Sequence, residues 1–269
     1  MSGEGNLALF CDFENIALGV RDAKYAKFDI QLVLERLLVK GSIVTKKAYC
    51  DWDRYKQFKP VMHEAAFELI EIPHVRLSGK NSADIRMVVD ALDLCYTKEH
   101  IDTFVIISGD SDFSPLVSKL RENAKTVIGV GVKNSTSDLL IANCDEFIYY
   151  DDLVAKPVPA KRKTKKTKGG SRKTSEKKNT KTDPAQEAID LVVDTTEALY
   201  SERGDRSKLW GSMIKQTLKR RRPQFNETYY GFSSFNDLLE EAQARDLIEL
   251  EMDERSGGYI VRNIKRKNR

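Results

Sequence analysis

The first 150 residues of the chain alternate short, nearly continuous apolar runs with stretches of helical periodicity. Thr103–Ser108 is the clearest apolar run, since it is rich in β-branched residues and too short to be a buried helix. Leu7–Cys11 and Thr126–Val132 have the same character, whereas Ile30–Val39 and Ala83–Tyr96 repeat their apolar residues at helical spacing. Strands that are apolar on both faces and separated by helices form parallel sheets covered on both sides. We therefore expect an α/β domain.

The same patterns place the remaining elements of this domain. The predicted strands are Ser42–Cys50, Ile70–Val75 and Glu146–Tyr150, and the predicted helices are Val61–Leu69, Ser111–Asn123 and Ser137–Ala142. In parallel sheets of this kind, ligands bind outside the carboxyl ends of the strands, near the point where the strand order reverses. That edge of the sheet is where functional residues are expected.

Acidic residues follow the predicted strands at this edge. Asp12 ends the first strand, and Asn15 lies three residues further on. Asp110 and Asp112 follow the most apolar strand, and Asp84 falls on the first turn of a predicted helix. Clustered carboxylates repel one another unless a cation neutralises them, and Mg²⁺ or Mn²⁺ prefers such oxygen ligands. A metal held there could activate water and stabilise charge on a transferring phosphoryl group.

Each of these residues also has a purely structural interpretation. Asp12 or Asp110 could cap a helix, and Asp112 or Asp84 could be a first-turn charge favoured by the helix dipole. Asp90 is expected to be solvated or structurally paired. We favour a shared metal site because the aspartates fall at corresponding ends of the predicted strands.

Three motifs in this order resemble the NYN domain, the LabA-like branch of the PIN-like ribonuclease superfamily. They are Cys11-Asp12-Phe13-Glu14-Asn15, then Lys80-Asn81-Ser82-Ala83-Asp84 with Val89-Asp90-Ala91-Leu92, then Ser108-Gly109-Asp110-Ser111-Asp112-Phe113-Ser114-Pro115-Leu116. The resemblance covers roughly residues 5–153. It implies a PIN-like, Rossmann-type parallel sheet and metal-dependent cleavage of RNA phosphodiesters.

The resemblance also implies the members of the site. By the family pattern, the acidic site and metal ligands are Asp12, Asp84, Asp110 and Asp112, with Asn15 as a polar companion among the catalytic residues. The chain departs from the pattern where Asn-Ser-Ala follows Lys80, since many relatives have a shorter Gly-Val type approach to the aspartate. Lys80 could contact an RNA phosphate, or it could be an ordinary surface lysine.

The C-terminal block has a different pattern. Helices are predicted at about 184–200, 206–220 and 233–244, and a hairpin is predicted from Leu247–Glu251 and Gly258–Val261. Three helices and a β-hairpin in about 80 residues are typical of a winged helix, a small α+β fold.

This block, over about residues 184–262, is similar to the OST-HTH or LOTUS domain. The matching features are Gly211-Ser212, Pro223-Gln224-Phe225, Tyr230-Gly231-Phe232 and Phe235-Asn236-Asp237-Leu238-Leu239. The resemblance implies an RNA-associated module, although some relatives bind proteins instead. A weaker RNA-binding prediction falls on Lys215, Lys219, Arg220, Arg221 and Arg222. Their alternative role is to complement a helix dipole.

Charge divides the chain into three segments. Residues 1–155 hold 18 basic and 24 acidic side chains, and residues 182–269 hold 15 basic and 16 acidic ones. Between them, residues 156–181 hold 12 basic side chains and 1 acidic one. Ala155–Thr182 lacks apolar periodicity, so we expect a disordered basic linker that attracts RNA without sequence preference or serves as a spacer. The predicted domains are therefore 1–154 and 183–264, joined by 155–182.

Other sequence features narrow the functional class. The four cysteines include no C-x-x-C pair, so we expect them to be buried, reduced thiols in a cytoplasmic protein. The three histidines are not spaced as metal ligands, so a His/Cys metal centre is not expected. No run approaches the ~18 apolar residues of a membrane span. The chain also lacks a P-loop, a G-x-G-x-x-G motif and a G-x-S-x-G elbow.

The leading hypothesis is a ribonuclease that uses Mg²⁺ or Mn²⁺ and has RNA as its partner. Its rival is a catalytically silent adaptor that binds RNA or binds protein through the C-terminal domain.

Overall fold

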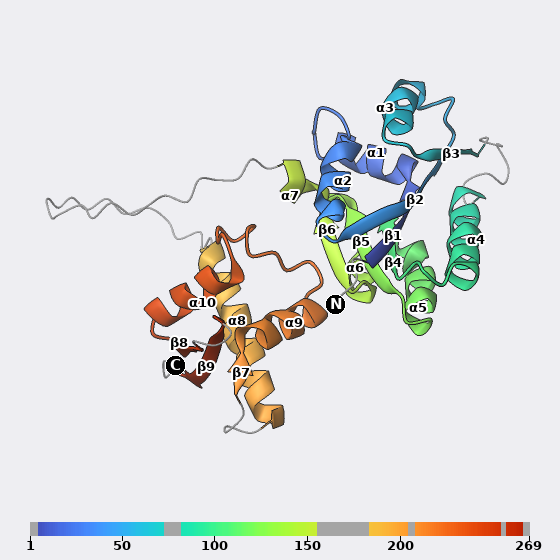
Figure 1. The fold of residues 1–269 in the computed structure, drawn as a ribbon. Coiled ribbons are helices and arrows are strands. Elements are labelled where there is room, and N and C mark those ends of the chain that lie inside the picture. Colours follow the sequence, from blue (N-terminus) through green and yellow to red (C-terminus); the bar gives the residue numbers. More distant parts are fainter. Residues whose placement is uncertain (1–4, 73–81, 155–182, 204–207, 254–256, 266–269) are drawn as a thin grey trace, which may run out of the picture. The chain divides into compact units, whose positions relative to one another are not determined.

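The structure is a computed structural model that describes residues 5–72, 82–154, 183–203, 208–253 and 257–265. The chain divides into two compact units, an N-terminal and a C-terminal one (Figure 1). The proposed linker 155–182 and Lys80 lie outside the described residues, so their predictions stay untested. Within the described ranges, no helix is long and apolar enough to cross a membrane.

The N-terminal unit contains a six-stranded parallel sheet in the order β3-β2-β1-β4-β5-β6, which confirms the predicted α/β fold. The strands are β1 Gly5–Asp12, β2 Gly41–Cys50, β3 Glu68–Glu71, β4 Thr103–Ile107, β5 Thr126–Gly131 and β6 Glu146–Tyr149. The sheet is built outward from β1, first to β2 and β3 and then, on the other side, to β4, β5 and β6. The strand order therefore reverses between β1 and β4, where the fold is expected to bind its ligand.

Helices cover both faces of this sheet, as Figure 1 shows. Alternate residues of β1 enter two separate cores: Leu7 and Leu9 pack in one, Ala8 and Phe10 in the other. The first core includes residues of α1 Phe13–Asp22 and α2 Ile30–Leu38, and the second includes residues of α4 Ser82–Thr97 and α5 Ser114–Glu122. Burial on both faces explains why the strands are nearly all apolar.

Shorter elements complete the unit. They are the 3₁₀ helices η1 Lys56–Phe58, η3 Ser111–Phe113 and η4 Lys133–Ser135, and the helices α3 Lys59–Glu64, α6 Asp138–Asn143 and α7 Tyr150–Val154. The helix predicted from Ser111 therefore begins as a 3₁₀ turn and becomes α-helical only at Ser114.

In this unit one sequence prediction was wrong and one helix was missed. The helix expected over Val61–Leu69 ends at Glu64, because the chain turns at Ala66 (φ 56°) and enters the sheet as β3. The helix α1 was not predicted at all. Its residues directly follow β1, and Asp12 is both the last residue of the strand and the cap of the helix, so no polar connector marks the boundary.

The described part of the C-terminal unit contains three helices and a three-stranded antiparallel sheet in the order β7-β9-β8. Its elements are α8 Pro184–Arg203, β7 Leu209–Trp210, α9 Gly211–Arg221, α10 Phe235–Ala244, β8 Ile248–Met252 and β9 Tyr259–Ile264. The helix expected from about 206 begins only at Gly211, because Leu209 and Trp210 pair with β9 and add a third strand to the predicted hairpin.

Candidate functional site

Asp12 lies at the carboxyl end of β1, where the strand order reverses, and is only 8% exposed. One carboxylate oxygen accepts a hydrogen bond from the backbone N–H of Asn15 (3.3 Å), which caps α1. The other accepts a hydrogen bond from the Ser108 hydroxyl (3.0 Å). The carboxylate is therefore held in one orientation by groups from two neighbouring strand ends.

Two further hydrogen bonds hold the segment that follows β4, and one of them joins it to α1. The side-chain oxygen of Asn15 accepts from the backbone N–H of Gly109 (2.8 Å), and the Ser108 hydroxyl accepts from the backbone N–H of Asp110 (3.2 Å). Ser108 is fully buried, and sequence reasoning did not select it. Its signal is a polar residue directly after an apolar strand, where it faces the neighbouring strand end.

Asp110 and Asp112 lie just beyond β4. The Asp110 carboxylate accepts from the backbone N–H of Asp112 (3.0 Å) and caps η3, so the helix-cap interpretation describes its local contact correctly. Asp110 is half-buried, and Asp112 is exposed. Capping uses one carboxylate oxygen and does not exclude a second role for the group.

The pKa shifts show that the aspartates act on one another. Burial, followed by the charge of Asp84, raises the pKa of Asp12 to about 7, and Asp110 adds to this effect. The hydrogen bonds from Asn15 and Ser108 partly oppose the shift. The structure therefore brings together carboxylates that lie far apart in the sequence.

The pKa of Asp84 is also raised by neighbouring aspartates. Burial, then the charges of Asp110 and Asp112, raise its pKa to about 6. Asp84 occupies the first turn of α4, so a separate helix brings it to the strand ends. We call Asp12, Asp84, Asp110 and Asp112 the acidic cluster.

Two further carboxylates near the strand ends already have cationic partners. Glu14 contributes a weaker charge effect on Asp84 and pairs with Arg54 (3.2 Å). Asp90 pairs with Lys47 (3.3 Å) and Arg86 (3.0 Å), and it accepts a hydrogen bond from Tyr49. Asp90 is thus structurally paired, as the sequence suggested.

The acidic cluster offers oxygen donors, which suit a hard divalent cation. Among the described residues, no three His, Cys, Asp or Glu side chains lie together in a way that could hold one metal ion. Mg²⁺ usually keeps several waters and needs only one or two direct carboxylate ligands. The donor chemistry therefore fits a hydrated cation better than a closed protein cage.

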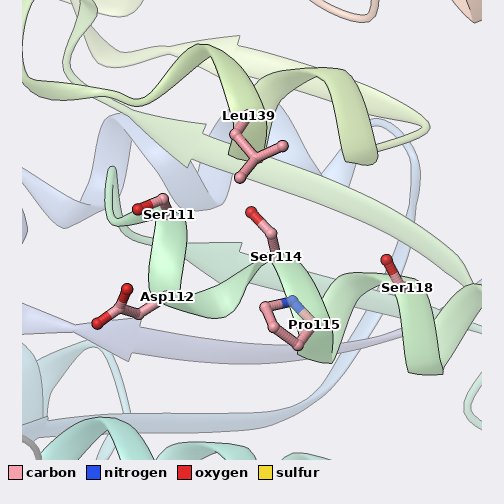
Figure 2. A pocket seen from close by; sticks show the side chains of 6 residues that line it. All are labelled: Ser111, Asp112, Ser114, Pro115, Ser118 and Leu139. Atoms are coloured by element: carbon pink, nitrogen blue, oxygen red, sulfur yellow. The ribbon is translucent and has the colours of Figure 1, made fainter.

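A shallow pocket of about 480 Å³ adjoins the cluster and shares Asp112 with it. Its lining residues come from η3, α5 and α6, as Figure 2 shows: Ser111, Asp112, Ser114, Pro115, Ser118 and Leu139. We call this hollow the Ser114 pocket.

The basic residues predicted on α9 and directly after it differ in their surroundings. Lys215 bonds to Glu227 (2.7 Å) and lies over the Phe235 ring, so a structural contact already engages its charge. Arg220, Arg221 and Arg222 are exposed. The exposed arginines are therefore better placed to meet a polyanion than Lys215.

Comparisons with known proteins agree with this architecture. An uncharacterized protein of Methanocaldococcus jannaschii is 28% identical over 138 residues, which are 51% of this chain and 52% of that protein. The meiosis regulator and mRNA stability factor 1 of Xenopus tropicalis is 26% identical over 149 residues, or 55% of this chain and 9% of that protein. The chain thus spans about half of the first relative's length and a small part of the second's.

A solved structure is also similar. The crystal structure of a protein of unknown function from Vibrio parahaemolyticus matches with a TM-score of 0.50 and 26% identity, covering 57% of this chain and 97% of that one. The sequence model of the NYN domain, a member of the PIN-like nuclease superfamily, matches residues 6–151. These residues make up more than half of the chain, and the chain belongs to the NYN domain family.

Proposed function

We propose that the protein is a metal-dependent ribonuclease that hydrolyses RNA phosphodiester bonds. The observation that carries the proposal is the buried Asp12 at the junction of β1 and β4, whose pKa is raised to about 7 by burial and by the charges of Asp84 and Asp110. Carboxylates that oppose one another's ionisation at the ligand-binding edge of a parallel sheet are typical of a functional site.

The ion would be Mg²⁺ or Mn²⁺, with ligands drawn from the acidic cluster. PIN-like nuclease domains generally use divalent metals, and a cation would relieve the repulsion that raises these pKa values. Bound there, it would lower the pKa of a water molecule and offset negative charge on the phosphate during hydrolysis.

The neighbouring side chains would act by positioning. Asn15 links α1 to the Gly109 backbone, and Ser108 hydrogen-bonds both Asp12 and the Asp110 backbone. These bonds fix the spacing of the two strand ends, and they favour the charged form of Asp12. Such preorganised carboxylates would need little rearrangement when the ion binds.

We further propose that the C-terminal unit is a winged-helix module of the OST-HTH or LOTUS type. Its order of helix, strand, two helices and two strands supports this assignment, as does its antiparallel sheet. The exposed Arg220, Arg221 and Arg222 would contact RNA phosphates. The four cysteines are buried thiols, which suits the proposed cytoplasmic location.

The second candidate function is a catalytically silent adaptor that binds RNA or a protein. The Xenopus relative is named for regulation and mRNA stability, which fits either function. The four aspartates of the acidic cluster favour the enzyme, because binding RNA phosphates gives no reason to gather carboxylates.

Cleavage of labelled single-stranded RNA tests the proposal. Full-length protein should cleave the RNA with Mn²⁺, and EDTA or the Asp110→Asn substitution should abolish cleavage. Asp138→Asn is the matched control, because Asp138 is exposed on the first turn of α6 and no shift of Asp12 or Asp84 involves it. Cleavage that survives both EDTA and Asp110→Asn would overturn the metal-site proposal, and tight binding without cleavage would favour the adaptor.

A further inference from the structure

The Ser114 pocket combines an apolar surface with hydroxyl groups. Leu139, on α6, is 57% exposed although it is a large apolar residue, and Pro115 supplies a second apolar surface from α5. Ser111, Ser114 and Ser118 supply hydroxyls. None of the described residues that line this hollow is a lysine or an arginine. Its volume of about 480 Å³ lies in the range that small ligand groups occupy.

We propose that the Ser114 pocket binds one unstacked nucleobase of the single-stranded RNA whose backbone lies at the acidic cluster. The inference rests on the proposed function, and it adds a base-binding position to that site. Enzymes that act on nucleic acids can hold an unstacked base between aromatic or apolar side chains and hydrogen-bond its polar edge.

The lining favours a base over the other parts of a nucleotide. A phosphate would lack a cationic partner in the pocket and would meet the carboxylate of Asp112 at one end. A base instead presents an apolar face, which Leu139 can contact, and a polar edge, which hydroxyls can bond. The chemistry of the pocket therefore matches a base and opposes a phosphate.

The Ser114 hydroxyl gives an independent indication that a ligand binds. Ser114 is only 6% exposed, and its hydroxyl has no hydrogen-bond partner among the described residues. Figure 2 shows this hydroxyl directed toward Leu139 within the pocket. Buried hydroxyls normally have a partner, and a base edge placed beside Leu139 would supply one after a small local adjustment. Because a hydroxyl both donates and accepts, Ser114 would tolerate several bases.

The position of the pocket defines which base it holds. Asp112 belongs both to the acidic cluster and to the pocket lining. A base in the pocket would therefore belong to a nucleotide next to the scissile phosphate, and more distant bases would not reach it.

Abasic substitution in the RNA tests this directly on the full-length protein. Oligonucleotides with one abasic nucleotide, moved along the strand, are cleaved with Mn²⁺ by wild type, Leu139→Ala and Leu38→Ala. Leu38→Ala is the matched control because Leu38 is 58% exposed at the end of α2 and lies outside the pocket. Wild type and Leu38→Ala should lose at least about tenfold in kcat/KM at one position beside the cleaved bond, and Leu139→Ala should lose less than about threefold there.

A second measurement keeps the inference separate from the proposed function. RNA carrying 4-thiouridine is photo-cross-linked to the full-length Asp110→Asn variant with Mn²⁺, and to wild type in EDTA. Cross-links should map to residues 111–118 or 139 and should fall at least fivefold in Leu139→Ala.

The outcomes separate the two proposals. If wild type cleaves no RNA but this cross-link forms and depends on Leu139, the ribonuclease proposal fails and the base pocket stands. If RNA is cleaved, but the abasic penalty is the same in Leu139→Ala and no cross-link maps to the pocket, the pocket inference is overturned and the ribonuclease stands. Loss of both cleavage and pocket cross-links overturns both.

Discussion

Asp12 combines two roles that the sequence could only present as alternatives. It caps α1, and it also lies close enough to Asp84 and Asp110 for their charges to raise its pKa. An exposed cap interacts favourably with the helix dipole, which lowers its pKa. Burial is the largest cause of the opposite shift here, and it depends on the strands on either side of β1.

This shift makes the stability of the ion-free protein depend on pH. An unfolded chain ionises an aspartate near pH 4, whereas folded Asp12 retains its proton up to about pH 7. Between these values the folded state binds more protons than the unfolded state. The stabilisation is therefore fully present below about pH 4 and is lost as the pH rises through about 7.

We predict that Asp12→Asn stabilises the ion-free protein at pH 8, by up to about 4 kcal/mol, and has little effect near pH 4. Asparagine keeps a side-chain oxygen for capping but does not ionise in the buried position. Urea unfolding in EDTA, followed by Trp52 fluorescence in a Trp210→Phe background, measures the effect on the N-terminal unit. Asp138→Asn is the control, and destabilisation by Asp12→Asn at pH 8 would contradict the assigned shift.

The raised pKa values of Asp12 and Asp84 also predict how metal affinity depends on pH. Ions bind the deprotonated form, so Asp12 with a pKa of about 7 must lose its proton first. Mn²⁺ affinity should be about tenfold weaker at pH 6 than at pH 8, and Asp84, with a pKa of about 6, should add to this loss. Titration calorimetry in matched buffers measures both values. Equal affinities at the two pH values would argue against binding by the acidic cluster.

At the scale of elements, the site depends on how β1–α1 and β4–η3 meet. Ser108 and Asn15 supply the hydrogen bonds across this junction. Ser108 directly follows β4, and Asn15 lies on the first turn of α1, three residues after the end of β1. The parallel pairing of β1 with β4 places Cys11 opposite Ile107, so the residues after each strand emerge side by side. The junction therefore follows from sheet register and would not form from either segment alone.

We predict that Ser108→Ala costs roughly 1–3 kcal/mol of stability, because Asp12 loses one of its two hydrogen-bond donors and the partly buried Asp110 amide loses its acceptor. The Ser108 hydrogen bond lowers the pKa of Asp12, so its loss should also move the pH midpoint of Mn²⁺ binding upward. Urea unfolding and calorimetry across pH 6–9 measure the two effects. Ser212→Ala, at an exposed serine of α9, is the control, and an unmoved midpoint would show that Ser108 acts only in packing.

At the scale of the whole molecule, charge is distributed unequally along the chain. The segment before residue 156 is acidic, whereas 156–181 holds 12 basic side chains and 1 acidic one. An acidic N-terminal unit attracts cations more readily than it attracts RNA. A basic tether would supply the missing attraction to phosphate without base recognition.

Deletion of residues 156–181 should therefore lower RNA affinity and flatten its dependence on salt. Each lost phosphate contact should reduce the slope of log K against log salt by about 0.7 for a single strand. Fluorescence anisotropy from 50 to 300 mM KCl measures the slope. Replacement of the segment by a neutral Gly/Ser linker of equal length is the control for spacing, and an unchanged slope would show that the segment is only a spacer.

The sequence by itself determined the local elements and the class of fold. Apolar runs such as Thr103–Ser108 identified the strands, and their burial on both faces required a parallel sheet covered by helices. Motif order identified the NYN domain, and Asp12 and Asp110 lie at the ends of their strands as predicted. These are short-range properties, because burial and periodicity can be read from neighbouring residues.

Only the tertiary structure decided which residues meet. The helix boundaries at Glu64 and Gly211 were set by strand pairing with distant segments, which local propensity does not contain. The hydrogen bond between Ser108 and Asp12, and the effect of the Asp84 charge on the pKa of Asp12, likewise join residues more than 70 positions apart. The sequence supplies the charged groups. The low-dielectric surroundings of these carboxylates, and the short distances between them, exist only once the sheet has formed.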